Sequence, residues 1–237
     1  MIHLTINGQP VEVAEGRTLL EACRERGIHV PTLCYHPALE PYGACRLCLV
    51  EIHPAGEPAR RRLVAACTHP CEEGSVVQTD TQVVRRSRRL TAELLAGSTQ
   101  APDIATLARQ LGVGEVRYAM PDTDGCMLCG LCVRACREIV GVSAISLIRR
   151  GIAKQVSPPF QIASSTCIGC GTCALICPTG ALKLSDVTGF RGVHPANSDY
   201  ERVYCHVCGY ADLSPHFIED VSTLWVKEEG GEGKDEG

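Results

Sequence analysis

The sequence predicts an α+β fold built from several small domains, and three observations lead to this prediction. Residues 2–79 contain short alternating stretches typical of strands, together with one helical segment and one loop. Residues 81–112 have helical periodicity instead. Residues 121–186 contain the cysteine frame C-x2-C-x2-C-x3-C twice. The chain has 237 residues, enough for one large domain or for two to three small ones.

The N-terminal stretch predicts a β-hairpin followed by a helix. Residues 2–13 alternate between apolar and polar side chains, and the dipeptide Asn7-Gly8 lies between the two arms, which is a strong hairpin signal. In the following "TLLEACRERG", Thr18 and Glu21 have the spacing of a capping box. Gly27 is placed to end this helix.

A loop and two further strands complete this first part. Residues 31–45 contain three prolines and a glycine and predict a loop. The segments "RLCLVEI" at 46–52 and "SVVQT" at 75–79 predict strands. The resulting order of strand, strand, helix, loop, strand, strand is that of a small α+β domain.

Two helices are predicted next. Residues 81–97 form the first, ending at Gly97, and carry "RRSRR" at 85–89. These arginines are interpreted as a solvated helix face, with a docking face for an acidic partner as the alternative. The second helix has apolar residues at i, i+3, i+4 and i+7 and a glycine at its end, namely Ile104, Leu107, Ala108, Leu111 and Gly112.

Cysteine is the outlier of the composition, with sixteen residues. A disulfide scaffold would need a secretory route, but the N-terminus lacks the charged and apolar regions of a signal peptide. No apolar run approaches the roughly 20 residues of a membrane span. We therefore expect a cytoplasmic protein whose thiols bind metal. The net charge of −4 argues against a nucleic acid as the main partner.

The two cysteine frames predict two [4Fe-4S] clusters. In this signature three cysteines of each run bind one cluster and the fourth reaches the other cluster. The predicted ligands of the first cluster are Cys126, Cys129, Cys132 and Cys177, and those of the second are Cys136, Cys167, Cys170 and Cys173. A pair of zinc knuckles is the alternative, but zinc sites usually use two separated C-x2-C pairs.

These runs resemble a bacterial two-cluster ferredoxin domain over residues 121–186. Residues 137–166 are then an insertion between its halves. The inserted "VGVSAISLIRRG" resembles the version found in complex I and soluble hydrogenase subunits. Arg137 replaces the proline that could follow the first run, whereas Pro178 follows the second.

Four cysteines near the N-terminus have the spacing C-x10-C-x2-C-x18-C. The phrases "PTLCYHPALEPYGACRLCLVEI" and "ACTHPCEEGSVVQTDT" resemble the [2Fe-2S] domain of complex I's large iron–sulfur subunit and of the diaphorase subunit of NAD-linked hydrogenases. The resemblance covers residues 1–82 and implies a β-grasp ferredoxin fold. It implies one [2Fe-2S] cluster bound by Cys34, Cys45, Cys48 and Cys67.

Two further cysteines lie in this domain outside the implied ligand set. Cys23 falls within the first predicted helix, where a buried packing thiol is expected. Cys71 is interpreted as a packing thiol too, with an alternative ligand role left open. Arg46, between two of the implied ligands, is either a residue that tunes the cluster potential or a surface charge.

Residues 83–120 depart from these relatives. In complex I and hydrogenase subunits, a His and three Cys bind another [4Fe-4S] cluster after the first domain. This chain has neither residue type there. The segment is therefore expected to be a helical linker without a cluster.

Residues 187–237 are predicted to be a C-terminal extension with a disordered, acidic and Gly-rich tail. Cys205 and Cys208 form a single C-x2-C, for which a zinc site and a metal-free docking pair are both considered. His194, His206, His216 or a partner subunit would supply the remaining zinc ligands.

The sequence contains no dinucleotide-binding G-x-G-x-x-G after a predicted strand and no P-loop, so no catalytic site is expected. The resemblance implies an electron-transfer subunit of a cytoplasmic multi-subunit oxidoreductase. Such a subunit relays electrons between a flavin/NAD(H) subunit and a catalytic or bifurcating subunit, such as a hydrogenase, a formate dehydrogenase or a heterodisulfide-reductase-like protein. A free-standing ferredoxin-type carrier and an iron–sulfur redox sensor are the alternatives.

Overall fold

A computed structural model describes residues 1–118, 125–161 and 166–183. The chain forms two compact units, Met1–Leu131 and Cys132–Gly237. Within the described ranges, no helix has both the length and the apolar character needed to cross a membrane. The α+β class is confirmed, because the first unit combines a mixed sheet with helices.

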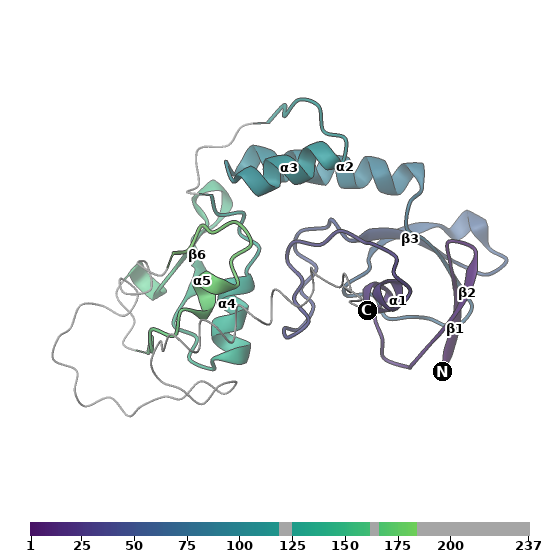
Figure 1. Ribbon diagram of the computed structural model, residues 1–237, viewed down its shortest axis with the longest axis horizontal. Helices are drawn as coiled ribbons and strands as arrows, with labels where there is room; N and C mark the ends of the chain where they lie inside the picture. The colour runs from purple at the N-terminus through teal and green to yellow at the C-terminus, as the bar shows by residue number, and fades with distance from the viewer. Residues whose placement is uncertain (119–124, 162–165, 184–237) are drawn as a thin grey trace, which may run out of the picture. The chain divides into compact units, whose positions relative to one another are not determined.

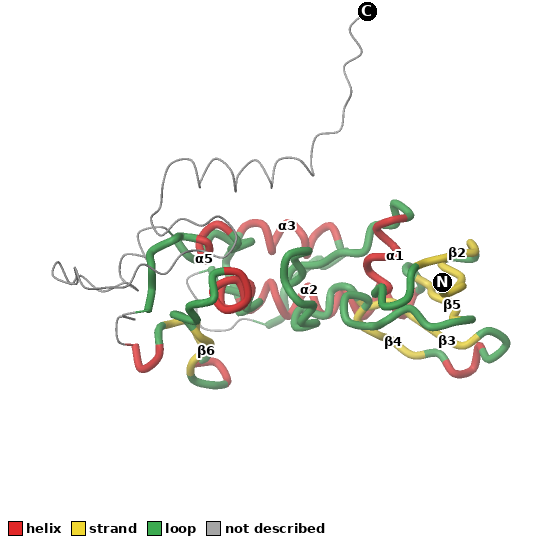
Figure 2. The backbone as a smooth tube through the Cα atoms, turned by 90° about the horizontal axis from the view of Figure 1, so that it is seen from below, coloured by secondary structure: helices red, strands yellow, loops and turns green. Residues whose placement is uncertain are grey.

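A five-stranded sheet organises the first unit, with the strand order β2-β1-β5-β3-β4 (Figure 2). Its strands are β1 Ile2–Ile6, β2 Gln9–Val13, β3 Leu49–Pro54, β4 Arg62–Ala65 and β5 Ser75–Gln78. β1 runs parallel to β5, whereas the other neighbouring strands are antiparallel. β5 therefore joins the hairpin β1–β2 to the pair β3–β4.

The predicted hairpin and its turn are confirmed. Asn7 and Gly8 both have positive φ, 50° and 82°, as the tight turns that match the twist of a hairpin require. The Asn7 side chain is also tied to the end of β5: its Nδ2 donates to Thr79 Oγ1, and the Thr79 amide donates to its Oδ1, both at 2.8 Å. The turn thus holds the two halves of the sheet together.

The helix α1, Leu19–Glu25, begins at the predicted capping box. The amide of Glu21 donates to Thr18 Oγ1 at 3.3 Å, and the amide of Thr18 donates to Glu21 Oε2 at 2.8 Å. Two backbone donors that the helix start leaves unpaired are satisfied in this way.

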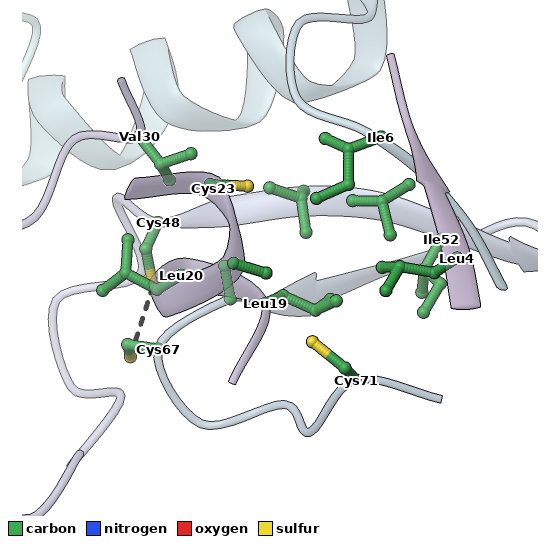
Figure 3. Close-up of a cluster of buried hydrophobic side chains, with 14 of the residues drawn as sticks. Leu4, Ile6, Leu19, Leu20, Cys23, Val30, Cys48, Ile52, Cys67 and Cys71 are labelled. Carbon is green, nitrogen blue, oxygen red and sulfur yellow. Dashed lines mark hydrogen bonds between the residues drawn. The ribbon is translucent and has the colours of Figure 1, made fainter. Parts of the chain in front are cut away.

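The core of the first unit lies between α1 and the sheet (Figure 3). Leu19, Leu20 and Cys23 of α1 are fully buried against strand residues such as Ile6 and Ile52. Burying each large aliphatic side chain contributes roughly 1.5–3 kcal/mol. This aliphatic packing explains how the domain is stable with few aromatic residues.

The remaining strands differ from the prediction in two places. β3 begins at Leu49, three residues later than predicted, because Arg46 has a φ of 58° and its left-handed conformation interrupts the strand. β4 was not predicted at all. β4 begins with the last of three consecutive arginines at 60–62, and this charged stretch masks the short apolar pattern of an edge strand.

Both predicted linker helices are present, and α3 lies alongside α2 (Figure 1). α2 spans Gln82–Ser98 and α3 spans Pro102–Gln110. Gly97 does not end α2 as predicted but lies inside it. A Cβ at this position would collide with the carbonyl oxygen of Tyr118, so Gly97 provides close packing instead.

The second unit is built from short elements. α4, Leu131–Arg134, starts at the boundary and continues into a π-helical turn, Ala135–Ile139. β6 Ser146–Ile148 and β7 Gln155–Ser157 pair antiparallel within the segment predicted as an insertion. The 3-10 turns Gly151–Ala153 and Pro159–Gln161 flank β7, and the helix α5, Thr172–Leu175, follows.

Candidate iron–sulfur sites

The four cysteines implied as [2Fe-2S] ligands all lie on loops at one end of the sheet of the first unit. Cys34 and Cys45 belong to the loop between α1 and β3, Cys48 immediately precedes β3, and Cys67 follows β4. All four are buried, with 1%, 7%, 1% and 1% of their surface exposed. Loops carry the thiols while the sheet and α1 fix where the loops begin and end.

The four thiols are arranged as two pairs. The Sγ atoms of Cys48 and Cys67 are 3.4 Å apart (dashed line in Figure 3). Cys34 and Cys45 also share a thiol–thiol hydrogen bond, and the Cys45 amide donates to Cys34 Sγ at 3.3 Å. Cys48, Cys34 and Cys45 all contribute to raising the pKa of Cys67, so the two pairs are close enough to interact electrostatically.

Within each pair, one sulfur holds a proton and the other is prepared as a thiolate. The hydrogen bond with Cys34 lowers the pKa of Cys45 to about 6, and the bond with Cys67 lowers the pKa of Cys48 to about 7. The same bonds, together with burial, raise the pKa values of Cys34 and Cys67. The thiolate is the form that binds metal. Cys45 and Cys48 therefore need little or no further deprotonation to bind metal at neutral pH.

This arrangement fits a two-iron cluster better than a single ion. Among the described residues, no group of three or more His, Cys, Asp or Glu side chains is arranged to hold one metal ion. Two adjacent pairs of thiols instead suit two irons, each bound by one pair. The loop also needs Gly43, which has a φ of 66° and whose added Cβ would come within 3.1 Å of Thr68 Cγ2.

Cys23 and Cys71 belong to the apolar core that also contains Cys48 and Cys67, but neither forms a thiol–thiol hydrogen bond with another described residue. Both are nearly inaccessible, at 0% and 4% exposure, and they pack with the side chains between α1 and the sheet. Burial raises the pKa of each to about 11. Burial in the core is compatible with the packing role predicted for Cys23 and favoured for Cys71, which stays a prediction.

In the second unit, a cavity brings together the predicted ligands of the second [4Fe-4S] cluster. Its wall contains Cys136 from the π-helical turn and Cys167, Cys170 and Cys173 from the second run. Apolar side chains and the backbone of Gly169 and Gly171 complete the lining. Both glycines have positive φ and leave room for a close ligand.

The thiols of this cavity act on one another electrostatically. Burial raises the pKa of Cys173 to about 12, and the neighbouring Cys170, Cys136 and Cys167 raise it further. Burial likewise raises the pKa of Cys136, although the Ala144 amide donates to its sulfur at 3.2 Å. If all four groups were ionised they would repel one another, and iron would supply the positive charge that compensates for this repulsion.

The predicted ligands of the first [4Fe-4S] cluster belong to both units. Cys126 and Cys129 lie in the first unit, and Cys132 and Cys177 lie in the second. The Leu128 amide donates to Cys126 Sγ at 3.4 Å. Burial alone would raise the pKa of Cys177, but the Leu182 amide and other donors outweigh it and lower the pKa.

Arg88 is a residue whose role the sequence did not predict. It belongs to the "RRSRR" segment interpreted as a solvated face, yet it is only 7% exposed. Arg85, Arg86 and Arg89 are exposed, so the interpretation is correct for them and wrong for Arg88. Arg46 is exposed as well. Cys205, Cys208 and the predicted disordered tail lie outside the described residues.

Comparisons with known proteins agree with this arrangement. Residues 1–82 match the family described as 2Fe-2S iron-sulfur cluster binding domain, and residues 125–181 match the 4Fe-4S dicluster domain. Among solved structures, one chain of the NAD+-reducing [NiFe]-hydrogenase in the H2-reduced state has a TM-score of 0.57 and 27% identity. This match covers 67% of the present chain and 75% of that chain.

Curated relatives extend the comparison to larger proteins. An NADH-quinone oxidoreductase subunit of Rhizobium meliloti is 32% identical over 77% of this chain, and NADP-reducing hydrogenase subunit HndD of Solidesulfovibrio fructosivorans is 31% identical over 77%. NADPH-Fe(3+) oxidoreductase subunit alpha of Geobacter sulfurreducens is 33% identical over 81%. The chain spans 24%, 36% and 25% of the length of these three relatives.

The buried thiol pairs, the cysteine-lined cavity and both domain matches lead to one conclusion. The chain is an iron–sulfur protein with a [2Fe-2S] and a [4Fe-4S] dicluster domain, related to iron–sulfur subunits of NADH-quinone oxidoreductases and of NAD(P)-linked hydrogenases.

Proposed function

We propose that the chain is an electron-transfer subunit of a cytoplasmic multi-subunit oxidoreductase. It would relay electrons between a flavin/NAD(H) subunit and a catalytic or bifurcating subunit. The ligand sets predicted from the sequence would hold one [2Fe-2S] and two [4Fe-4S] clusters, which supply one-electron redox chemistry when bound. None of the described cysteines forms a disulfide, which suits a reducing compartment.

One observation within the first unit carries this proposal. Cys34 and Cys45, two ligands of the [2Fe-2S] set, lie in the same buried apolar cluster as Leu47 and Ala92, and Cys129 packs against that cluster. Cys129 is a predicted ligand of the first [4Fe-4S] cluster. Cysteines from two predicted ligand sets therefore surround one group of apolar side chains, which supports electron transfer between the two proposed clusters.

This proximity matters because electron tunnelling weakens steeply with the distance between redox centres. In relatives, the segment after the first domain carries an additional cluster, whereas residues 83–120 here contain no Cys and no His. α2 and α3 instead contribute apolar residues, such as Ala92 and Ala108, to the group between the two ligand sets. These helices would replace an intermediate cluster by close packing.

The chain's own residues would bind the clusters and keep water away from them. Backbone amides donate to the sulfurs of Cys34, Cys126 and Cys136, and hydrogen bonds of this kind favour the more negative, reduced state. Burial of the [2Fe-2S] thiols limits access of oxidants and solvent. The chain would thus set potentials and distances, while substrate chemistry belongs to its partners.

The proposal is tested by anaerobic purification of the tagged chain from its native cells. A flavin-containing subunit and a second, catalytic subunit should elute with it in fixed ratio. The isolated chain should not oxidise NADH with an artificial dye. A chain that elutes alone with its clusters intact would indicate a free carrier. Elution with DNA and no oxidoreductase would indicate a sensor, and either result would overturn the proposal.

A further inference from the structure

The buried Arg88 presents a problem of charge. A guanidinium stays protonated in proteins, and burying a charge is unfavourable unless an opposite charge or hydrogen bonds compensate for it. Arg88 is 7% exposed and lies on α2, one turn from the exposed Arg85. The structure must therefore contain groups that make this buried charge favourable.

The hydrogen bonds of Arg88 lead toward the [2Fe-2S] site. Its Nε and Nη2 atoms both donate to the carbonyl oxygen of Leu49, at 3.1 and 2.7 Å. Leu49 directly follows the ligand Cys48. The guanidinium thus fixes the backbone at the point where the ligand loop enters β3.

Hydrogen bonds to one neutral carbonyl leave the charge itself uncompensated. Within the described parts of the chain, Arg88 forms no ion pair with a carboxylate. The ionisable groups that act on the Arg88 charge are Asp80, whose side chain is 68% exposed, and the buried thiols of Cys48 and Cys23. Burial lowers the pKa of Arg88, and each of these three groups, when ionised, opposes that shift.

We propose that Arg88 is the internal countercharge of the [2Fe-2S] site, held beside Cys48 so that it stabilises the reduced cluster and raises its reduction potential. Arg88 acts through the field of its charge and through Leu49, and is a positioning residue rather than a ligand. The proposal rests on the ligand set given under the proposed function. Reduction adds one negative charge to the site, and a nearby positive charge favours that state.

The test is a redox titration of the reconstituted full-length chain, following the [2Fe-2S] signal by electron paramagnetic resonance. Arg88→Met keeps much of the packing volume and removes the charge, and Arg88→Lys keeps the charge. Arg86→Gln removes an exposed charge from the same helix and is the matched control. We expect Arg88→Met to lower the reduced-to-oxidised ratio at fixed potential about tenfold, equivalent to about 59 mV for a one-electron couple.

Arg88→Lys should stay closer to the wild-type midpoint than Arg88→Met, and Arg86→Gln should match the wild type. An unchanged midpoint in Arg88→Met, or equal shifts in the Met and Lys variants, would overturn the proposal. If Arg88→Met fails to assemble the cluster while Arg88→Lys assembles it, the charge is required and the proposal stands. If both fail, shape rather than charge is essential and the proposal is wrong.

A failure of the proposed ligand set gives a different result. In that case the wild-type chain itself would show no two-iron signal, whereas a failure of the Arg88 proposal leaves that signal intact with an unmoved midpoint.

Discussion

At the scale of single residues, cysteine serves two purposes in the first unit: some cysteines are predicted cluster ligands and others pack in the core. Six buried cysteines occupy the region between α1, the sheet and the ligand loops. In each hydrogen-bonded pair one thiol has a lowered pKa, Cys45 in the first pair and Cys48 in the second, whereas Cys23 and Cys71 have pKa values raised by burial. All six are buried, so it is the thiol–thiol hydrogen bond, and not burial, that separates the four predicted ligands from Cys23 and Cys71.

This distinction predicts opposite outcomes for two neighbouring cysteines. Cys71→Ala should keep the [2Fe-2S] signal in electron paramagnetic resonance, because Cys71 packs in the core. Cys67→Ala should abolish or severely alter that signal, because Cys67 is paired with Cys48. Loss of the signal in Cys71→Ala and its survival in Cys67→Ala would reassign the fourth ligand.

At the scale of elements, short local signals fix where structure begins. The capping box of α1 makes both of its expected hydrogen bonds. Thr81 caps the start of α2, and its Oγ1 accepts from the Val84 amide at 3.2 Å. α1 is only seven residues long and depends on its cap and on packing for stability. The loop of the [2Fe-2S] ligands starts soon after this helix.

Thr18→Ala should therefore destabilise the first unit by about 1 kcal/mol, because the amide of Glu21 loses its acceptor. Urea denaturation followed by far-UV circular dichroism measures this loss. Thr18→Ser keeps the hydroxyl oxygen and is the matched control. A Ser variant as unstable as the Ala variant would show that the methyl group, and not the cap, is responsible.

A second prediction at this scale concerns Cys136 in the π-helical turn. This turn carries Cys136 into the cavity with Cys167, Cys170 and Cys173. Cys136→Ser should damage the cluster of the second run and leave the other four-iron cluster in place, as Mössbauer and electron paramagnetic resonance spectra would show. Cys132→Ser should have the reverse effect. Loss of the first-run cluster in Cys136→Ser would contradict the crossed ligation.

At the scale of the whole molecule, the chain consists of two compact units, and α2 and α3 belong to the first of them together with the five-stranded sheet. The chain spans only about a quarter of the length of two of its relatives. The helices α2 and α3 contain neither His nor Cys, so they offer no cluster ligand of their own.

The metal content of the complete chain follows from this organisation. Two four-iron clusters and one two-iron cluster give about ten irons per chain after full anaerobic reconstitution. Metal analysis of the purified chain checks this number, and Cys205 and Cys208 are expected to add no iron. About fourteen irons would reveal a third four-iron cluster, and about eight without a two-iron signal would remove the cluster from the first unit.

Most of the first unit was predictable because its signals are local. Asn7-Gly8, the capping box and the helical periodicities each specify an element from a few adjacent residues. The start of β3 was not predictable from periodicity, because the ligand loop forces Arg46 into a left-handed conformation. The burial of Arg88 depends on a carbonyl 39 positions earlier in the chain, which no local pattern records.

The pairing of the [2Fe-2S] cysteines also depends on contacts between distant residues, which the sequence pattern does not reveal. Spacing identified the frames in both domains, but the division of the N-terminal set into Cys34 with Cys45 and Cys48 with Cys67 arises only when β4 returns its loop beside β3. That strand was missed because arginines precede it. The ligands were therefore suggested by motif, and their partnership is a product of tertiary structure.

The place of β5 in the sheet has a consequence for synthesis on the ribosome. β5 is the last strand of the five-stranded sheet to be made, yet it lies between the two earlier pairs and contacts both β1 and β3. Until residues 75–78 have left the exit tunnel, the nascent hairpins have no common partner, and contacts between residues this far apart form slowly. All four [2Fe-2S] thiols precede β5, so they emerge before the fold that shelters them. We therefore expect a cluster to be delivered to this domain after β5 has been translated.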